Sequence, residues 1–126
     1  MKVEIKHYCA YLPYGVQATY TGEDRFWLKN GHVTTILPSD IDMMAKTPEF
    51  KMHLKPLSKY GDVIGRAMVE LNCDIDDQIA IEQFANQQIS LASLPYSAYE
   101  VLVRNKVDIF NLIPQNLAID LNTLKP

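Results

Sequence analysis

Aromatic and basic residues gather at the start of this chain, and they are the group of residue types with the clearest potential for binding. Six of the twelve aromatic residues fall within the first 27 positions, interleaved with lysine and arginine. Bases stack on aromatic rings while cations hold phosphates, and each stacked base contributes about 1–3 kcal/mol in single-strand binders. Tyrosine and tryptophan are equally ordinary cross-strand packing in a β-sheet. The members considered for a ligand surface are Tyr11, Tyr14, Arg25, Trp27 and Lys29.

A second basic group comes from an alternating run at residues 50–55. Residues two apart on a strand share a face. Lys51, His53 and Lys55 should therefore project together from the outer face of a sheet, with the apolar residues between them in the core. This row is where a small anionic ligand would bind, joined by Arg25 or Lys29. The alternative is an edge strand whose lysines prevent association of one sheet with another.

Catalytic and metal-binding motifs are absent, so we expect no enzyme, no cofactor and no metal site. The sequence has no GxSxG, HExxH, P-loop or GxGxxG pattern. The acidic cluster at residues 74–77 does not continue as a calcium loop, because such a loop needs glycine at its sixth position and glutamate at its twelfth. Ile79 and Ala85 occupy those positions. Carboxylates at a helix N-terminus explain the cluster better.

Composition and charge limit the function classes. A chain of 126 residues, 48% hydrophobic and 21% charged, is expected to form one domain spanning residues 1–126. Its net charge of −3 disfavours nucleic acid as a partner. Residues 1–66 hold nine Lys and Arg against seven Asp and Glu (+2), and residues 67–126 hold three against eight (−5). This asymmetry points to an anionic ligand on one side and a basic partner on the other, or to a mixed solvated surface.

The compartment is predicted to be the cytoplasm of a host cell. The alternation of charged and apolar residues at the start gives no signal-peptide core, and no stretch approaches the roughly 18 apolar residues of a membrane-spanning helix. Cys9 and Cys73 lack a CxxC spacing, so they are expected to be reduced thiols.

The first half of the sequence predicts strands. Residues 16–20 alternate in period two, and residues 25–28 and 33–37 flank Asn30–Gly31, which is typical of a hairpin with a type I′ turn. Residues 39–46 predict a short helix, and Pro56 should end the strand at 50–55.

The second half predicts helices. We expect one from Ser58 to about Leu71, one capped by Asp74, and one starting at a capping box at Ser97 and continuing until Pro114. The alternating segment 117–121 should pack on the domain. The fold class is therefore α+β, with a small curled antiparallel sheet of three or four strands packed against two or three C-terminal helices.

Three segments carry a family resemblance: residues 7–15 (HYCAYLPYG), 54–58 (LKPLS) and 110–120 (FNLIPQNLAID). With them the chain resembles an uncharacterised small-protein family of phages and prophages of gut Bacteroidales. The resemblance implies a phage accessory protein and brings no activity with it. Two functions remain open: a non-enzymatic protein that binds a host protein or a small anionic ligand, and a nucleic-acid-binding protein that uses an aromatic and basic sheet surface.

Overall fold

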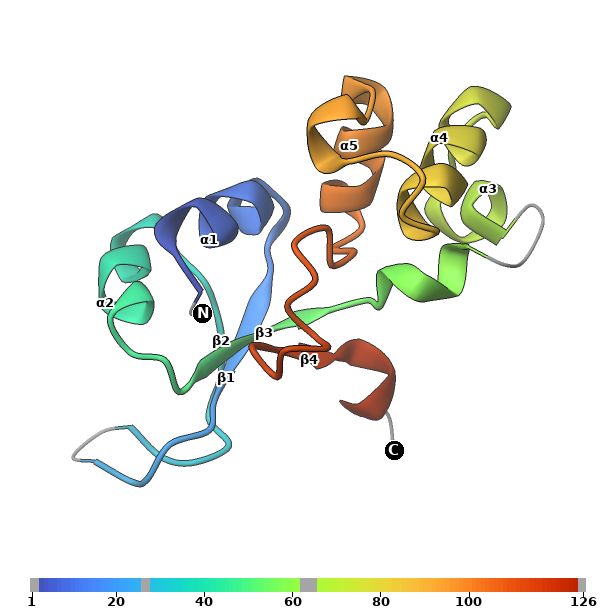
Figure 1. The fold of residues 1–126 in the computed structure, drawn as a ribbon. Helices are drawn as coiled ribbons and strands as arrows, with labels where there is room; N and C mark the ends of the chain where they lie inside the picture. The colour runs from blue at the N-terminus through green and yellow to red at the C-terminus, as the bar shows by residue number, and fades with distance from the viewer. Residues whose placement is uncertain (1–2, 26–27, 62–65, 125–126) are drawn as a thin grey trace.

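Four strands form one open, mixed sheet in the order β2-β1-β3-β4, and α-helices lie beside and above it (Figure 1). The computed structural model describes residues 3–25, 28–61 and 66–124. The fold class is α+β, as the sequence predicts. The sheet is not wholly antiparallel, because β4 runs parallel to β3. The strands are β1 (Gln17–Tyr20), β2 (Val33–Thr35), β3 (Phe50–Leu54) and β4 (Ala118–Asp120).

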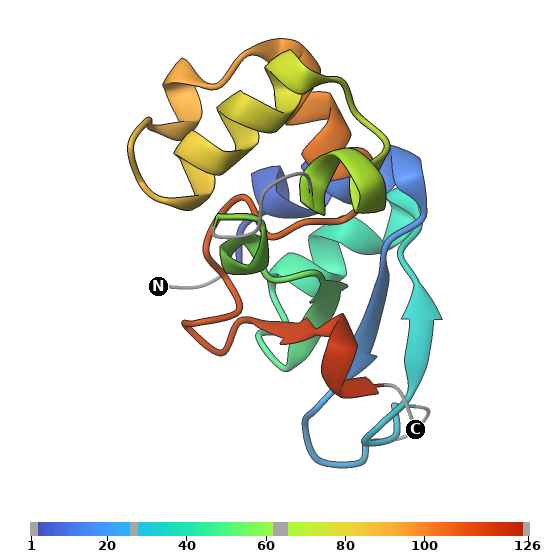
Figure 2. The same cartoon turned by 90° about the vertical axis from the view of Figure 1, so that its right-hand side faces the viewer.

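The helical layer draws on both halves of the chain, whereas the sequence predicts C-terminal helices over the sheet. Figures 1 and 2 show two helices of the first half beside the strands and three helices of the second half grouped above them. The α-helices are α1 (Ile5–Tyr11), α2 (Ile41–Ala45), α3 (Arg66–Leu71), α4 (Ile75–Ala85) and α5 (Tyr96–Arg104). Short 3-10 helices link them: η1 (Leu12–Tyr14), η2 (Pro38–Asp40), η3 (Leu57–Tyr60), η4 (Leu91–Ser93) and η5 (Leu121–Leu124).

β3 organises the core because its side chains alternate as predicted. Phe50, Met52 and Leu54 are at most 2% exposed and face the helices. β3 pairs with β1 on one side and with β4 on the other. It is therefore an interior strand, and the interpretation of its lysines as protection of a sheet edge is wrong.

The Asn30–Gly31 turn forms, but it does not join the predicted strands. β2 pairs with β1, not with residues 25–28, where Arg25 and Leu28 make only an isolated bridge. The His32 amide donates to the Lys29 carbonyl at 3.0 Å. Of the two central residues of this turn, Asn30 and Gly31, only Gly31 has a positive φ, +87°. A type I′ turn needs positive φ at both central residues, so this turn has the pattern of type II. β2 pairs with residues 17–20 because Ala18 and Tyr20 become fully buried in this arrangement.

Two of the predicted C-terminal helices differ in the structure. The cap at Asp74 is confirmed, since its carboxylate accepts the Asp77 amide at 2.9 Å. Ser58 lies inside η3 and does not cap a continuous helix to Leu71. Ser97 lies inside α5 and donates to the Asp77 carboxylate at 2.7 Å, so the capping box is wrong.

α5 also ends earlier than Pro114, at Arg104. Lys106 then takes φ +60° and turns the chain, so that Val107 bridges to Lys55. Val107 is fully buried. Val107 fits the helical spacing of apolar residues because it is buried, but it lies in an extended bridge after the turn. The prediction that the helix continues to Pro114 is wrong.

α1 is a helix that the sequence does not predict, and it is held by a buried tyrosine. The Tyr11 hydroxyl donates to the Val107 carbonyl at 2.6 Å and accepts the Ile109 amide at 3.0 Å. The buried Asp108 carboxylate beside it accepts the Leu112 and Ile113 amides, each at 2.8 Å. The Tyr11 bonds join the C-terminal segment to the N-terminal helix, and the Asp108 bonds hold the turn within that segment.

The segment 117–121 packs on the domain, as predicted. Ala118 lies opposite Met52 in the parallel pair and is 4% exposed. β4 thus completes the sheet and covers the side of β3 that would otherwise be an edge.

Candidate functional site

The sheet face opposite the core side chains of β3 holds a nearly buried histidine. His53 on β3 points away from the core side chains of Met52 and Leu54, yet it is only 5% exposed. Its Nε2 lies 2.5 Å from the Thr19 hydroxyl on the neighbouring strand β1. Its Nδ1 has no hydrogen-bond partner among the described residues. The ring is therefore anchored through one nitrogen, and the other remains available to a ligand.

A cavity of about 320 Å³ lies beside this histidine. It forms where the start of β1, the middle of β3 and the turn after α5 meet the segment that follows β4. Its polar lining comes from Gln17, His53 and Lys106, with Gly15 and Leu121 completing the wall. Gly15 (φ +75°) ends η1 and turns the chain into β1, which brings Gln17 to the rim.

The electrostatics of the cavity favour a neutral imidazole next to a lysine. Burial lowers the pKa of His53 below its ordinary value of 6.5. When the Thr19 hydroxyl donates to Nε2, the neutral ring carries its proton on Nδ1. Neither Lys106 nor Lys51 makes an ion pair within the described residues. In that tautomer the site offers the His53 Nδ1–H and the Gln17 amide as donors, with the positive charge of Lys106 beside them.

The predicted aromatic surface does not form from the described residues. Tyr11 is fully buried and hydrogen-bonded to backbone, and Tyr8 and Tyr20 are buried as well. Tyr14 is half-buried against the core. Trp27 lies outside the described residues. Packing and buried hydrogen bonds use these rings, so the prediction of Tyr11 as a ligand-binding residue is wrong.

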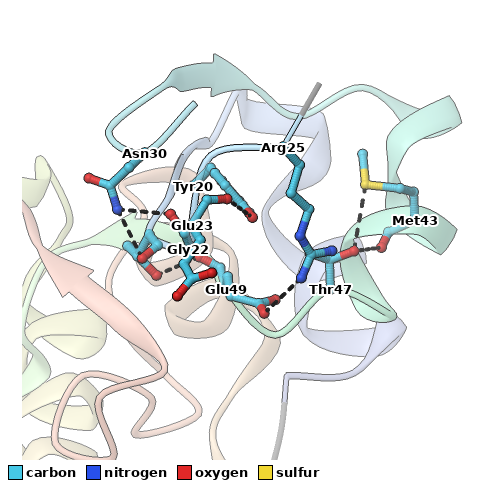
Figure 3. A network of polar contacts seen from close by, with 9 residues as sticks. Tyr20, Gly22, Glu23, Arg25, Asn30, Met43, Thr47 and Glu49 are labelled. Atoms are coloured by element: carbon cyan, nitrogen blue, oxygen red, sulfur yellow. Dashed lines mark hydrogen bonds and ion pairs between the residues drawn. The ribbon is translucent and has the colours of Figure 1, made fainter. Parts of the chain in front are cut away.

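Arg25 and Lys29 do not join the basic row on the sheet. Both belong to the β1–β2 connection, which follows the end of β1 opposite to Gln17. Arg25 pairs with Glu49 at 3.7 Å, and Asn30 donates to the Thr21 and Gly22 carbonyls at 3.1 and 3.0 Å (Figure 3). Lys29 is exposed. The connection is thus an internally bonded loop whose arginine is paired with Glu49.

The row of Lys51, His53 and Lys55 forms only in part. Lys51 lies on the same face as His53, opposite Thr19, and is partly exposed. His53 is recessed between the neighbouring strands and the C-terminal segment. Lys55 follows the end of β3 and bridges to Val107. The structure therefore replaces an open row of cations with a recessed imidazole flanked by lysines.

Thr19, Gln17 and Lys106 are site residues that the sequence analysis misses. Thr19 and Gln17 belong to the outward set of the alternating run 16–20, so the period of that strand was a usable signal. Lys106 had no such signal, because its position depends on the turn that ends α5.

Two further hollows have different chemistry. A groove of about 590 Å³ runs between η3, the end of α4 and residues 109–111, and its lining carries no charged side chain. A hollow of about 640 Å³ in the β1–β2 connection is lined by Glu23, Asp24, Arg25 and Glu49. Within the described ranges, no three His, Cys, Asp or Glu side chains converge in a way that could hold a metal ion.

Neither the search for membrane spans among the described residues nor the comparison with known proteins gives a match. No helix among the described residues has the length and apolar character to cross a membrane. The chain matches no protein-family model, no curated protein and no solved structure.

Proposed function

We propose that this protein is a non-enzymatic accessory protein, in the phage setting that the sequence resemblance implies, and that it binds a small anionic ligand in the cavity beside His53. The observation that carries the proposal is the recessed His53, whose Nδ1 faces no protein partner while Lys106 lines the same cavity. A phosphate or carboxylate group of a small molecule accepts hydrogen bonds from such donors.

The cavity suits a small ligand in both size and chemistry. Its volume of about 320 Å³ lies at the lower end of the range for small-molecule sites, which is about 300–1,000 Å³. The Gln17 amide and the His53 Nδ1–H would donate hydrogen bonds, and Lys106 would supply charge. Lys51 on the same face adds to the positive potential.

Binding explains the site better than catalysis. A hydroxyl on an imidazole, as in the Thr19–His53 pair, resembles a nucleophile with its base. In such pairs a third group orients the base, typically a carboxylate on its other nitrogen. The described residues give the His53 Nδ1 no carboxylate. The lowered pKa also makes the ring a weaker base.

The nucleic-acid alternative is less well supported. It depends on aromatic faces open to stacking, and Tyr8, Tyr11 and Tyr20 are at most 1% exposed. We keep it as an outcome of the experiment below.

The experiment is a titration of the full chain with inorganic phosphate, followed by NMR of the three histidine rings at constant pH and ionic strength. The His53 ring signals should shift and saturate, while those of the exposed His32 should not. Lys106→Gln should weaken binding by about tenfold, since it removes a charge-assisted contact. Lys46→Gln is the matched control, because Lys46 is exposed on α2 and pairs with Asp42 at 3.1 Å.

Two results would overturn the proposal. One is a His53 shift that does not saturate or that Lys106→Gln leaves unchanged. The other is tight, strongly salt-dependent binding of a labelled oligonucleotide by the wild type that survives Lys106→Gln, which would favour the nucleic-acid alternative.

A further inference from the structure

Helix α4 carries apolar residues on two opposite faces. Successive residues on a helix are rotated by about 100°, so Ala80, Ile81 and Phe84 share one face, and they are 7%, 0% and 9% exposed. Ile75 and Ile79 lie one turn apart on the opposite face, and they are 58% and 48% exposed. The inner face fills the core, and the outer isoleucines have no role in it.

Carboxylates flank this outer pair of isoleucines. The same rotation places Asp76 on one side of the pair and Glu82 on the other. Within the described residues neither makes an ion pair. α4 contains no lysine or arginine at all, and Asp74 precedes it as the cap. The border of the apolar pair on α4 therefore holds Asp76 and Glu82 together with the uncharged Gln78 and Gln83, and no cation; Glu82 accepts a hydrogen bond from the Gln78 side chain.

The neighbouring helix extends the exposed apolar character. α3 lies beside α4 in both views of the fold (Figures 1 and 2), and the Met68 amide donates to the Gln78 side chain at 2.9 Å. Val69 on α3 is 83% exposed. The outer surface of α3 and α4 therefore presents Val69, Ile75 and Ile79 to solvent on the acidic half of the chain.

We infer that the outer face of α4 binds a basic amphipathic helix of another protein. Ile75 and Ile79 would contact its apolar side, at the one-turn spacing that helix–helix contacts use. Asp76 and Glu82 would pair with lysine or arginine flanking that apolar side. A second copy of this chain would bring the same carboxylates into opposition, so like charges oppose self-association through this face. This inference is independent of the anion site, which uses the other side of the sheet.

Binding of two model peptides to the full chain tests the inference. The probe is a labelled helical peptide of about five turns, with leucine on one face and lysine elsewhere, and its counterpart carries glutamate in place of lysine. Fluorescence anisotropy should show binding of the lysine peptide only. Ile75→Ser with Ile79→Ser should weaken that binding by about tenfold or more, since central apolar anchors dominate such interfaces.

Matched variants distinguish specific binding to the outer face of α4 from nonspecific binding to exposed apolar side chains. Val33→Ser with Leu37→Ser removes two apolar side chains that are 48% and 55% exposed elsewhere on the molecule, and binding should not change. Asp76→Asn with Glu82→Gln should weaken binding several-fold and reduce its dependence on salt. Glu23→Gln with Asp24→Asn in the β1–β2 connection is the charge control and should have no effect.

Three outcomes would overturn the inference: equal binding of both peptides, equal losses in the Ile75/Ile79 and Val33/Leu37 variants, or a dimer of the free protein that the Ile75/Ile79 variant abolishes. Circular dichroism of each variant checks folding. If the serine variant unfolds, Ile75→Lys with Ile79→Lys is measured instead, because exposed lysine favours a helix and should repel the basic peptide.

Discussion

The Thr19 hydroxyl on β1 lies 2.5 Å from Nε2 of His53 on β3, on the sheet face opposite the core side chains Met52 and Leu54. The two residues come from antiparallel neighbours in the sheet. Their contact fixes the imidazole at the edge of a cavity whose other polar residues are Gln17 and Lys106. The candidate site is thus a product of strand register and of the turn after α5.

Burial of His53 should make stability depend on pH. The unfolded ring binds a proton near pH 6.5, whereas burial lowers the pKa of the folded ring. The unfolded state then binds more protons, so the free energy of unfolding should fall as the pH decreases from about 7 towards 5. Urea unfolding at both pH values checks this, and His53→Gln should lose less stability than the wild type over that interval.

The comparison with His53→Gln is needed because other groups titrate as well. Burial lowers the pKa of His7, which acts in the same direction, and raises the pKa of Asp108, which acts in the opposite direction. Both remain in the variant. Parallel pH profiles for wild type and variant would contradict the role assigned to His53.

Tyr11→Phe should destabilise the fold strongly. The substitution removes the hydroxyl that donates to the Val107 carbonyl and accepts from the Ile109 amide. Both backbone groups then stay buried without a hydrogen-bond partner. Each unsatisfied buried group costs about 1–3 kcal/mol, so we expect a loss of about 2–4 kcal/mol in chemical unfolding. Tyr14→Phe is the matched control, because the Tyr14 hydroxyl has no hydrogen bond to the described residues. Equal losses in the two variants would refute this assignment.

Substitutions at Gly31 should follow the tolerance of each residue for positive φ. Gly31 has a φ of +87°, and no heavy atom lies within 4 Å of the position that a Cβ would take, so the penalty is conformational and not steric crowding. Gly31→Val should cost about 1–2 kcal/mol of stability, and Gly31→Asn should cost less, because asparagine tolerates this region. Thermal unfolding measures both, and a Val variant as stable as the wild type would rule out the turn.

Truncation after Pro114 should abolish the cooperative unfolding transition. It removes β4, which pairs with β3 along Met52, His53 and Leu54, and exposes the core beneath Ala118. Truncation after Leu124 keeps β4 and η5 and should retain the transition. A stable, soluble protein ending at Pro114 would show that β4 is dispensable.

The sequence by itself determines the elements whose signals are local. The alternation at 50–55 gives β3 and its buried face, Asp74 gives the start of α4, and Gly31 gives a turn with positive φ, because each depends on neighbouring residues only. The α+β class follows from the same signals.

Only the tertiary structure decides which of these elements meet. Arg25 carries the same charge as Lys106, yet Arg25 pairs with Glu49 in the β1–β2 connection while Lys106 reaches the cavity through the turn after α5. Tyr11 has the residue type of a binding surface and serves as a buried hydrogen-bonding group. The parallel pairing of β4 with β3 makes β3 an interior strand and helps to enclose His53. Such pairings join residues far apart in the chain, and their energy depends on burial and partners that no local pattern encodes.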